Sequence, residues 1–568
     1  MWDTFVRPIR DHLPLWLMLL PVWGAVLVAF TRSLGDAAVR RTMLVNLWLS
    51  VSLCVWMVVA YVPLKPTSSR QQAAMIEPLE QFQFRDRFSW VGETRTALIE
   101  RTRRDGERQT VEVPIRWGPD ICLEVGVDGM SVWFVALSVL LIAVGSAVGD
   151  HESEVKQSTA WLWLQASLVG TFVALDIVLF SVCWMSTTLA ITWLIGQGGG
   201  LQRYEAGPRW LKRGWLGVGI VLLGLGGLVL ALGWLHPFPN RPETPLIFSI
   251  PELIALIRQN AAAGENALQW GSISSWLFWL LVFGFTGPLW LVPFHRGFVE
   301  VFAAAPRGVA LVLAGVALKV GVYGWLRFIL PLFPDLLRQH AEGITTVFGM
   351  SSLLAAALAF GATNWRSRIA LATCSSLSLS LLGMITLTLE GMTGGVLRLL
   401  SHGLTAALLV WMLPDEVPRR MGTLTRPSSD VLSAGDGREY TSSVRWVIRI
   451  ALFAWIGMPG LSGFVPEFLT PFGLFQHEFN AAAMSLATSG LIAWMWVRAE
   501  RDLPDGSQTI RSRREMVVAA VLVVLNIGMG IAPRFVVDRM QPSLLRLLPL
   551  DRETSATSSE TVPVAEVR

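Results

Sequence analysis

The sequence predicts an all-α integral membrane protein, because its composition and its segment lengths both fit a lipid bilayer. The chain has 568 residues, of which 53% are hydrophobic and 15% are charged. Soluble domains carry about 25% charged residues. The mean hydropathy is +0.51, and many apolar segments have the roughly 20 residues that a helix needs to cross a bilayer. These observations exclude an ordinary soluble enzyme and a disordered chain.

About fourteen segments are apolar and long enough to be predicted as transmembrane helices. Only helices and closed barrels can cross lipid, and the segment lengths exclude barrel strands. In chain order, the segments cover residues 13–31, 42–63, 129–149, 159–175, 177–195, 214–235, 273–293, 308–333, 345–363, 369–389, 393–413, 444–472, 479–498 and 515–533.

Polar stretches divide the predicted chain into five parts. These are two N-terminal helices, an extramembrane loop, a helical core, the last helices and a polar, disordered tail, at residues 1–63, 64–127, 128–475, 476–533 and 534–568. Within the loop, Thr94–Arg116 alternates like paired strands around the turn signal Asp105-Gly106. We therefore expect a small β-hairpin there.

The distribution of basic residues predicts the orientation in the membrane, since short inside loops carry an excess of lysine and arginine. The excess follows the odd-numbered predicted helices, at Arg32, Arg40, Arg41, Arg203, Arg209, Lys212, Arg213, Arg366, Arg368, Arg511, Arg513 and Arg514. Both termini are therefore expected on the outside.

Lysine is rare in this chain, and one lysine lies in the middle of an apolar segment. The four lysines are Lys65, Lys156, Lys212 and Lys319, whereas the other basic residues are arginines. A buried lysine can give up its proton, but an arginine stays charged. Lys319 is therefore a candidate proton carrier. The alternative is a structural lysine that pairs with a carboxylate or extends its amine to the membrane surface.

Three further polar residues inside or between apolar segments are functional candidates, because such residues are costly in lipid. His402 can exchange a proton near neutral pH or make a structural hydrogen bond between helices. Glu467 lies beside Pro466 and Gly457–Gly460, which interrupt a helix, and could exchange protons there or cap the resumed helix. Asp176 could act in the same way or cap a helix start.

Two predicted helices are broken, the seventh by Pro288 and Pro293 and the twelfth by Pro459 and Pro466. Broken helices at corresponding positions of two halves are typical of inverted-repeat transporters.

Neither a redox cofactor nor nucleic acid is expected. Cys54, Cys122, Cys183 and Cys374 are isolated and form no metal-ligand spacing, so we expect no metal or iron–sulfur site. The net charge of +4 is too small and too scattered for nucleic-acid binding.

Several of these segments resemble the proton-translocating membrane subunits of respiratory complex I, most closely subunit M (chain 4), and the related Mrp antiporters. The resemblance lies in GVDGMSVWFVAL (126–137), FVALDIVLF (172–180), PLWLVPFH (288–295), LAGVALKVGVYGWLRF (313–328), LRLLSHGLTAALL (397–409) and GMPGLSGFVPEF (457–468).

The resemblance implies two inverted five-helix repeats, with 128–475 as an antiporter-like proton-translocation core. It also implies a proton relay in which Lys319 is central, His402 is a link and Glu467 is the outlet acid. Asp176 would match a conserved acid before the fifth helix, and Arg209 a basic position.

The sequence also departs from this family at the inlet side. Met185 stands where a fifth-helix glutamate is expected, and Ile273–Phe294 has no charged residue where a seventh-helix lysine is expected. Leu377 replaces a histidine of the tenth helix. The resemblance therefore implies a divergent member with a degenerate inlet half-channel.

Three functions follow. The first is a membrane-arm subunit of a complex-I-like NADH:quinone oxidoreductase in a bacterial inner membrane. It would hold no redox cofactor and would contact lipid and other membrane-arm subunits. The second is a subunit of a cation/proton antiporter or of an ion-coupled inorganic-carbon uptake complex. The third is a non-pumping scaffold paralogue.

Overall fold

The computed structural model describes twelve stretches of the chain, namely residues 9–62, 82–102, 108–147, 154–197, 201–235, 246–262, 272–413, 439–440, 442–476, 478–501, 508–509 and 513–548. The first half contains the helices α2 (Leu13–Thr31), η1 (Arg32–Leu34), α3 (Asp36–Ala60), α5 (Ser131–Ser146), α6 (Glu154–Val173), α7 (Ile177–Gly196), α8 (Leu201–Leu235) and α9 (Ile250–Ala262), with the strands β1 (Gln83–Thr102) and β2 (Arg108–Val127).

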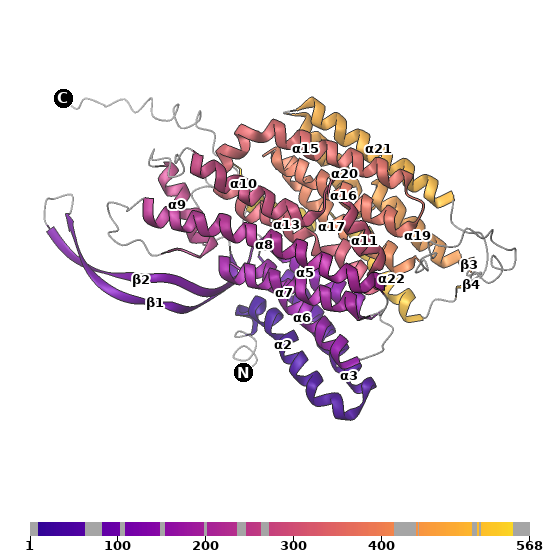
Figure 1. Cartoon of the computed structure of the whole chain (residues 1–568), viewed down its shortest axis with the longest axis horizontal. Coiled ribbons are helices and arrows are strands. Elements are labelled where there is room, and N and C mark those ends of the chain that lie inside the picture. Colours follow the sequence, from indigo (N-terminus) through magenta and orange to yellow (C-terminus); the bar gives the residue numbers. More distant parts are fainter. Residues whose placement is uncertain are drawn as a thin grey trace, which may run out of the picture.

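The second half is almost entirely helical (Figure 1). It contains α10 (Ser272–Thr286), η2 (Gly287–Leu289), α11 (Arg296–Ala304), α12 (Arg307–Val312), η3 (Leu313–Ala317), α13 (Lys319–Gly324), η4 (Trp325–Ile329), α14 (Leu330–Leu332), α15 (Pro334–Gly361), α16 (Trp365–Ile385), α17 (Leu389–Met412), α19 (Ser442–Ile456), α20 (Phe464–Phe475), α21 (Phe479–Arg501), α22 (Arg513–Ile531) and α23 (Arg534–Leu545), with the short paired strands β3 (Glu439–Tyr440) and β4 (Gln508–Thr509).

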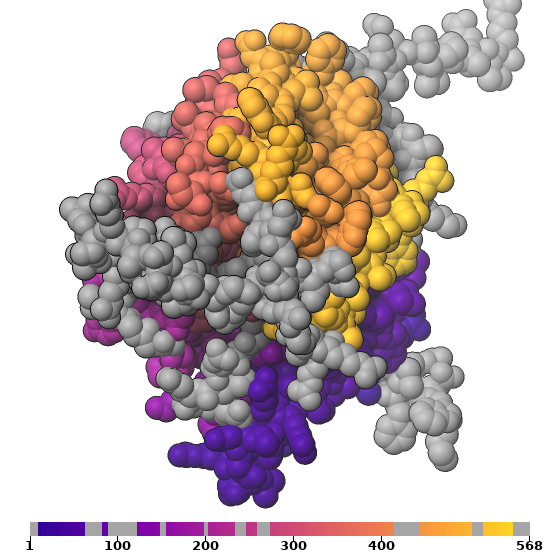
Figure 2. All heavy atoms as spheres, turned by 90° about the vertical axis from the view of Figure 1, so that its right-hand side faces the viewer, coloured from indigo at the N-terminus to yellow at the C-terminus, as the bar shows by residue number. Residues whose placement is uncertain are grey.

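Three helical spans form the centre of the bundle. The span Arg307–Leu332 runs continuously from α12 to α14. All residues of its 18-residue apolar stretch are buried, as are those of α17, and 94% are buried in α16. The windows in α2 and α3 are only 39% buried, and in both views these helices form a lobe at the edge of the molecule (Figures 1 and 2). Polar side chains in the central spans therefore lie far from the protein surface.

The predicted membrane-spanning segments coincide with helices or interrupted helices of the structure. Eight described helices are individually long and apolar enough to cross a membrane, or nine if the bent pair α22 and α23 forms one span. The expected number of about fourteen crossings and the inverted repeats stay predictions, as does the division of the chain into five parts.

Both predicted helix breaks are present. The helix α10 ends at Thr286 and gives way to the 3₁₀ turn η2, and α19 ends at Ile456 before α20 starts at Phe464. Glycine is required in the second break, because Gly457 has a φ of +88° and a Cβ on Gly463 would overlap the Ala454 carbonyl oxygen.

The hairpin consists of β1 and β2, which pair antiparallel from Gln83↔Val127 to Thr102↔Arg108. It is longer than Thr94–Arg116, and it extends out from the bundle (Figure 1). The expected turn at Asp105-Gly106 lies outside the described residues. Ion pairs hold the base of the hairpin: Arg85 pairs with the fully buried Glu124, and Arg87 pairs with Glu252 of α9.

The start of the C-terminal tail differs from the expectation of disorder, because Arg534–Leu545 forms α23. Its buried residues Val536, Met540 and Leu544 recur every four positions, so they line one face of the helix. This face packs against the bundle, and Ser543 Oγ accepts a hydrogen bond of 3.1 Å from the backbone N–H of Gly129. The Ser/Thr-rich stretch Thr554–Val564 lies beyond the part of the chain that the structure describes.

The crossing of α5 and α12 depends on two glycines in backbone contact. A Cβ on Gly145 would lie 2.8 Å from the Gly308 carbonyl oxygen, and a Cβ on Gly308 would overlap the Gly145 carbonyl oxygen. No atom lies within 4 Å of a Cβ placed on Gly226 of α8. We predict that Gly308→Ala lowers the free energy of unfolding by about 1–3 kcal/mol through overpacking, whereas Gly226→Ala leaves it unchanged or raises it through helix propensity.

Thermal unfolding of the two purified variants in detergent checks this prediction. Equal midpoints for Gly308→Ala and Gly226→Ala would show that the α5–α12 crossing tolerates a side chain.

Candidate functional site

Lys319 lies at the centre of the bundle and is fully buried. The preceding residues, Leu313–Ala317, form a π-helical segment, which is a local widening of a helix that often occurs at functional sites. The Nζ of Lys319 donates hydrogen bonds to two carbonyl groups of this segment, that of Ala314 at 3.0 Å and that of Gly315. The helix therefore supplies acceptors for its own buried amine.

Neither structural alternative for Lys319 applies within the described part of the chain. No carboxylate there forms an ion pair with its amine, and the side chain does not reach the protein surface. Two buried arginines of the same central helices do have carboxylate partners, as described below.

His402 of α17 is brought next to Lys319 by a close approach of two helices. Its Nδ1 lies 3.5 Å from Lys319 Nζ, and a Cβ on the adjacent Gly403 would lie 2.6 Å from the Gly315 carbonyl oxygen. A neutral imidazole protonated on Nε2 can accept a hydrogen bond at Nδ1. His402 packs edge-on against Trp455, with ring centroids 4.8 Å apart, and its Nε2 has no hydrogen-bond partner among the described residues.

Glu467 at the start of α20 makes a bidentate ion pair with Arg398 of α17. Arg398 Nη1 donates to Oε1, and Nη2 donates to Oε2 at 3.1 Å. Ser489 of α21 donates a third hydrogen bond to Oε2 at 2.6 Å. The carboxylate is 20% exposed, whereas Arg398 is 6% exposed, so Glu467 lies between the buried interior and the protein surface.

Sequence reasoning missed Arg398, although the signal was present. It is a charged residue inside the apolar segment Leu397–Leu409 and lies four positions before His402, so the two side chains share a helix face. Asn526 of α22 was also missed. Its buried Oδ1 accepts hydrogen bonds from Thr405 at 3.0 Å and from Ser462 at 2.7 Å, which joins α17 to the second helix break.

A second buried ion pair lies on the helix of Lys319, two turns beyond it. Arg327 Nη1 donates to Asp128 Oδ2 at 2.9 Å, and Arg327 also donates to the hydroxyl of Tyr323. Asp128 Oδ1 accepts from the backbone N–H of Ser131 at 2.8 Å. Asp128 therefore caps the start of α5 and also fixes the position of the central helix.

Asp176 lies apart from these groups, at the point where α7 begins. Its Oδ1 accepts hydrogen bonds from the backbone N–H groups of Val178 at 2.8 Å and Leu179 at 3.1 Å. The neighbouring Leu175 N–H bonds to the Glu124 carbonyl at the hairpin base at 2.8 Å. These contacts correspond to the helix-capping alternative.

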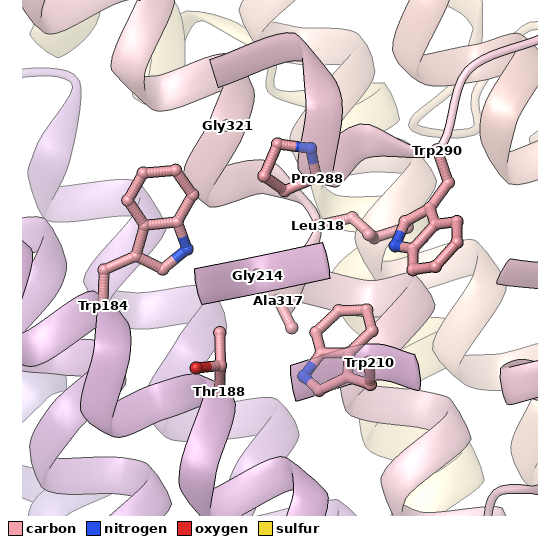
Figure 3. Close-up of a pocket in the computed structure, with 9 residues that line it drawn as sticks. All are labelled: Trp184, Thr188, Trp210, Gly214, Pro288, Trp290, Ala317, Leu318 and Gly321. Atoms are coloured by element: carbon pink, nitrogen blue, oxygen red, sulfur yellow. The ribbon is translucent and has the colours of Figure 1, made fainter. Parts of the chain in front are cut away.

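The inlet side carries no charge at either of the two positions where the resemblance predicts one. Met185 of α7 is partly buried, and α10 carries no charged residue. A small cavity lies between α7, α8, the break after α10 and the Lys319 helix (Figure 3). Trp184 and Trp290 face each other across it, with Pro288 and Trp210 on its other sides. It leaves about 10 Å³ for water, which is close to the minimum for one molecule.

Arg213 of α8 lies beside this cavity. Its Nε donates to the Gly287 carbonyl at 2.9 Å, and its guanidinium stacks over Trp290 and Phe294. Arg209, the expected basic position, instead forms exposed ion pairs with Glu205 and Glu300. Leu377, which replaces the expected tenth-helix histidine, is fully buried in α16.

No group of three or more His, Cys, Asp or Glu residues that could hold a metal ion occurs in the described ranges. The four cysteines are buried free thiols.

Solved structures of three membrane complexes contain subunits with the same fold. A chain of respiratory complex I from Thermus thermophilus matches with a TM-score of 0.68 at 21% identity, covering 94% of this chain and 100% of that chain. A chain of the Mrp complex from Dietzia matches with a TM-score of 0.68 at 15% identity, covering 97% and 99%. A chain of an archaeal membrane-bound sulfane sulfur reductase matches with a TM-score of 0.69 at 14% identity, covering 94% and 98%.

Sequence relatives agree with the fold. NADH-quinone oxidoreductase subunit M of Rhodobacter capsulatus is 28% identical over 454 residues, covering 76% of this chain and 83% of the relative. The subunit M of Mycobacterium tuberculosis is 26% identical over 391 residues, covering 67% of each. Residues 174–493 match the family described as "NADH:quinone oxidoreductase/Mrp antiporter, TM". The chain is therefore a multi-span membrane protein that belongs to the NADH:quinone oxidoreductase/Mrp antiporter family.

Proposed function

We propose that this chain is a proton-translocating membrane-arm subunit of a complex-I-like NADH:quinone oxidoreductase. The observation that carries the proposal is the contact between Lys319 and His402. It places a fully buried amine without a carboxylate partner, among the described residues, 3.5 Å from a buried imidazole. Both groups can gain and lose a proton, so the pair can hold and pass one in the membrane interior.

The outlet leads from this pair along α17 to Glu467. His402 lies one helical turn from Arg398, and Arg398 holds the Glu467 carboxylate. Because Glu467 is partly exposed, it can release a proton to the surface. The short loop around Gly457–Gly463 provides the irregular backbone that membrane proteins tolerate beside a cavity or a polar path.

The inlet is the divergent half of this path. The charges expected on the fifth and seventh helices are replaced by Met185 and an uncharged α10, and the cavity beside them has room for about one water at most. Proton entry on this side therefore depends on water and hydroxyl groups rather than on an ion pair. The position of Asp176 supports a role as helix cap, and we assign the relay to the other three residues.

The names of the relatives support an assembly with other membrane-arm subunits, since these relatives are subunits of multi-subunit complexes. We propose that the protein lies in a bacterial inner membrane, as its bacterial relatives indicate, and that both termini are outside, as its loop charges indicate.

Lys319→Ala should abolish the contribution of this subunit to proton translocation, because it removes the one buried lysine amine among the described residues. Lys156→Ala is the matched control, since Lys156 is exposed on α6. The measurement is the number of protons translocated per electron by the complex reconstituted in liposomes. A wild-type ratio for Lys319→Ala, in a fully assembled complex, would favour the non-pumping scaffold.

Arg398→Leu should destabilise the protein, because it leaves the largely buried Glu467 carboxylate without its cation. The expected loss is about 1–3 kcal/mol, less than for a fully buried pair, since the carboxylate keeps its bond to Ser489 and some exposure.

The double variant Arg398→Leu/Glu467→Gln should recover part of this loss, because the uncompensated charge is gone. Thermal unfolding of the single and double variants in detergent measures the coupling. If the two effects simply add, the ion pair does not stabilise the fold.

A further inference from the structure

Gln165 of α6 is a fully buried polar side chain that the proposed relay does not use. Neither its Oε1 nor its Nε2 has a hydrogen-bond partner in the described part of the chain, and the same holds for the indole N–H of Trp161 one turn earlier. A buried amide group that is left unpaired destabilises a protein. Buried groups of this kind are commonly satisfied by ordered water.

Contacts at both ends fix α6 alongside the helix of Lys319. Near one end, the Trp161 ring packs at the crossing of Gly145 and Gly308. Near the other end, Tyr323 donates a hydrogen bond of 3.0 Å to the Phe172 carbonyl, and the Phe172 ring packs against Phe134 of α5. The two helices therefore run parallel, and α5 runs antiparallel beside both.

Gln165 faces the groove between α5 and the Lys319 helix. Trp161, Gln165 and Phe172 are four and seven residues apart, a spacing that places them on one helix face. From the Gly145–Gly308 crossing, four residues of helix advance about 6 Å. Four residues from the crossing, the three helices have Gln165 on α6, Leu141 on α5 and the start of the π-helical segment on the Lys319 helix at about the same level of the bundle.

The carbonyl groups that accept hydrogen bonds from the Lys319 amine lie at about the same level of the bundle as Gln165. Leu141 packs directly against Gly315, and Gly315 is one of the two residues whose carbonyls accept from Lys319 Nζ. The unpaired amide of Gln165 thus lies at the same level of the bundle as the segment that positions the amine. This path approaches Lys319 along α6, away from the aromatic cavity beside α7 and α10.

We propose that Gln165 and Trp161 hold ordered water in this groove, and that this water delivers the proton to Lys319 from the Arg307 end of the helix. The water donates a proton to the neutral amine and takes one from the next water toward the surface, so that no net charge is left on it. Gln165 accepts from and donates to the water, whereas the Trp161 indole donates only. The inference rests on the proposed function and supplies the inlet that Met185 and α10 lack.

The variant Gln165→Leu in the assembled complex tests this proposal, with Gln157→Leu on the same helix as the matched control. The number of protons translocated per electron should fall to the level of Lys319→Ala, while Gln157→Leu keeps the wild-type value. Gln165→Glu, which keeps a side chain able to bind water, should restore translocation. A cryo-EM map of the complex should contain water density within hydrogen-bonding distance of Gln165.

If no water is bound at Gln165, Gln165→Leu should stabilise the protein, because an apolar side chain then replaces an unpaired buried amide. A raised unfolding midpoint for Gln165→Leu with wild-type proton translocation would overturn the proposal. Lys319→Ala would then still report separately on the relay. If Gln165→Leu fails to assemble, Trp161→Phe keeps an aromatic side chain without the indole N–H donor, and wild-type translocation in that variant would overturn the proposal as well.

Discussion

A charged amine in an apolar interior is the constraint on which the central part of this molecule depends. Transfer of an ammonium group out of water is very costly unless other polar groups replace its hydration. Here the replacement comes from two carbonyl groups of the π-helical segment and from the imidazole of His402. The glycines at positions 315 and 403 allow the two central helices to approach closely enough for this arrangement. Because the partners of this amine among the described residues are neutral, it can give up its proton, whereas a carboxylate partner would hold the amine in its charged form.

Two buried arginines of the central helices, unlike this amine, are held in ion pairs. Arg327 and Arg398 also lie in central helices, and each is paired with a carboxylate, Asp128 or Glu467. Arginine keeps its proton under all ordinary conditions, so it needs a counter-ion when buried. Each pair thus stabilises the packing of a central helix, and the two arginines keep their charge while Lys319, His402 and, nearer the surface, Glu467 exchange the proton. This separation of fixed and exchangeable charge is what makes the interior suitable for moving one proton.

Much of the fold could be predicted from the sequence, because apolar length and helix-breaking residues act locally. The two breaks follow from Pro288, Pro459 and the glycines beside them, and Lys319 and His402 were visible as polar residues within apolar segments. Their pairing depends on helix packing, which no local pattern encodes. The partner of Glu467 was missed for the same reason, and the π-helical segment has no sequence signal in its run of small apolar residues. Nor could the sequence reveal that Gln165 has no hydrogen-bond partner within the described ranges, since that depends on the packing of three helices.

The contact between α23 and Gly129 has a consequence for how the protein is made. The turn before α5 is covered by a helix that comes more than four hundred residues later in the chain, through the bond between Ser543 and the Gly129 N–H. Helices enter the membrane in the order of synthesis, so this turn stays uncovered until nearly the whole polypeptide has been inserted. Asp128, which holds Arg327 of the central helix, lies in the same turn. The ion pair that positions the Lys319 helix is therefore covered only after α23 has been made.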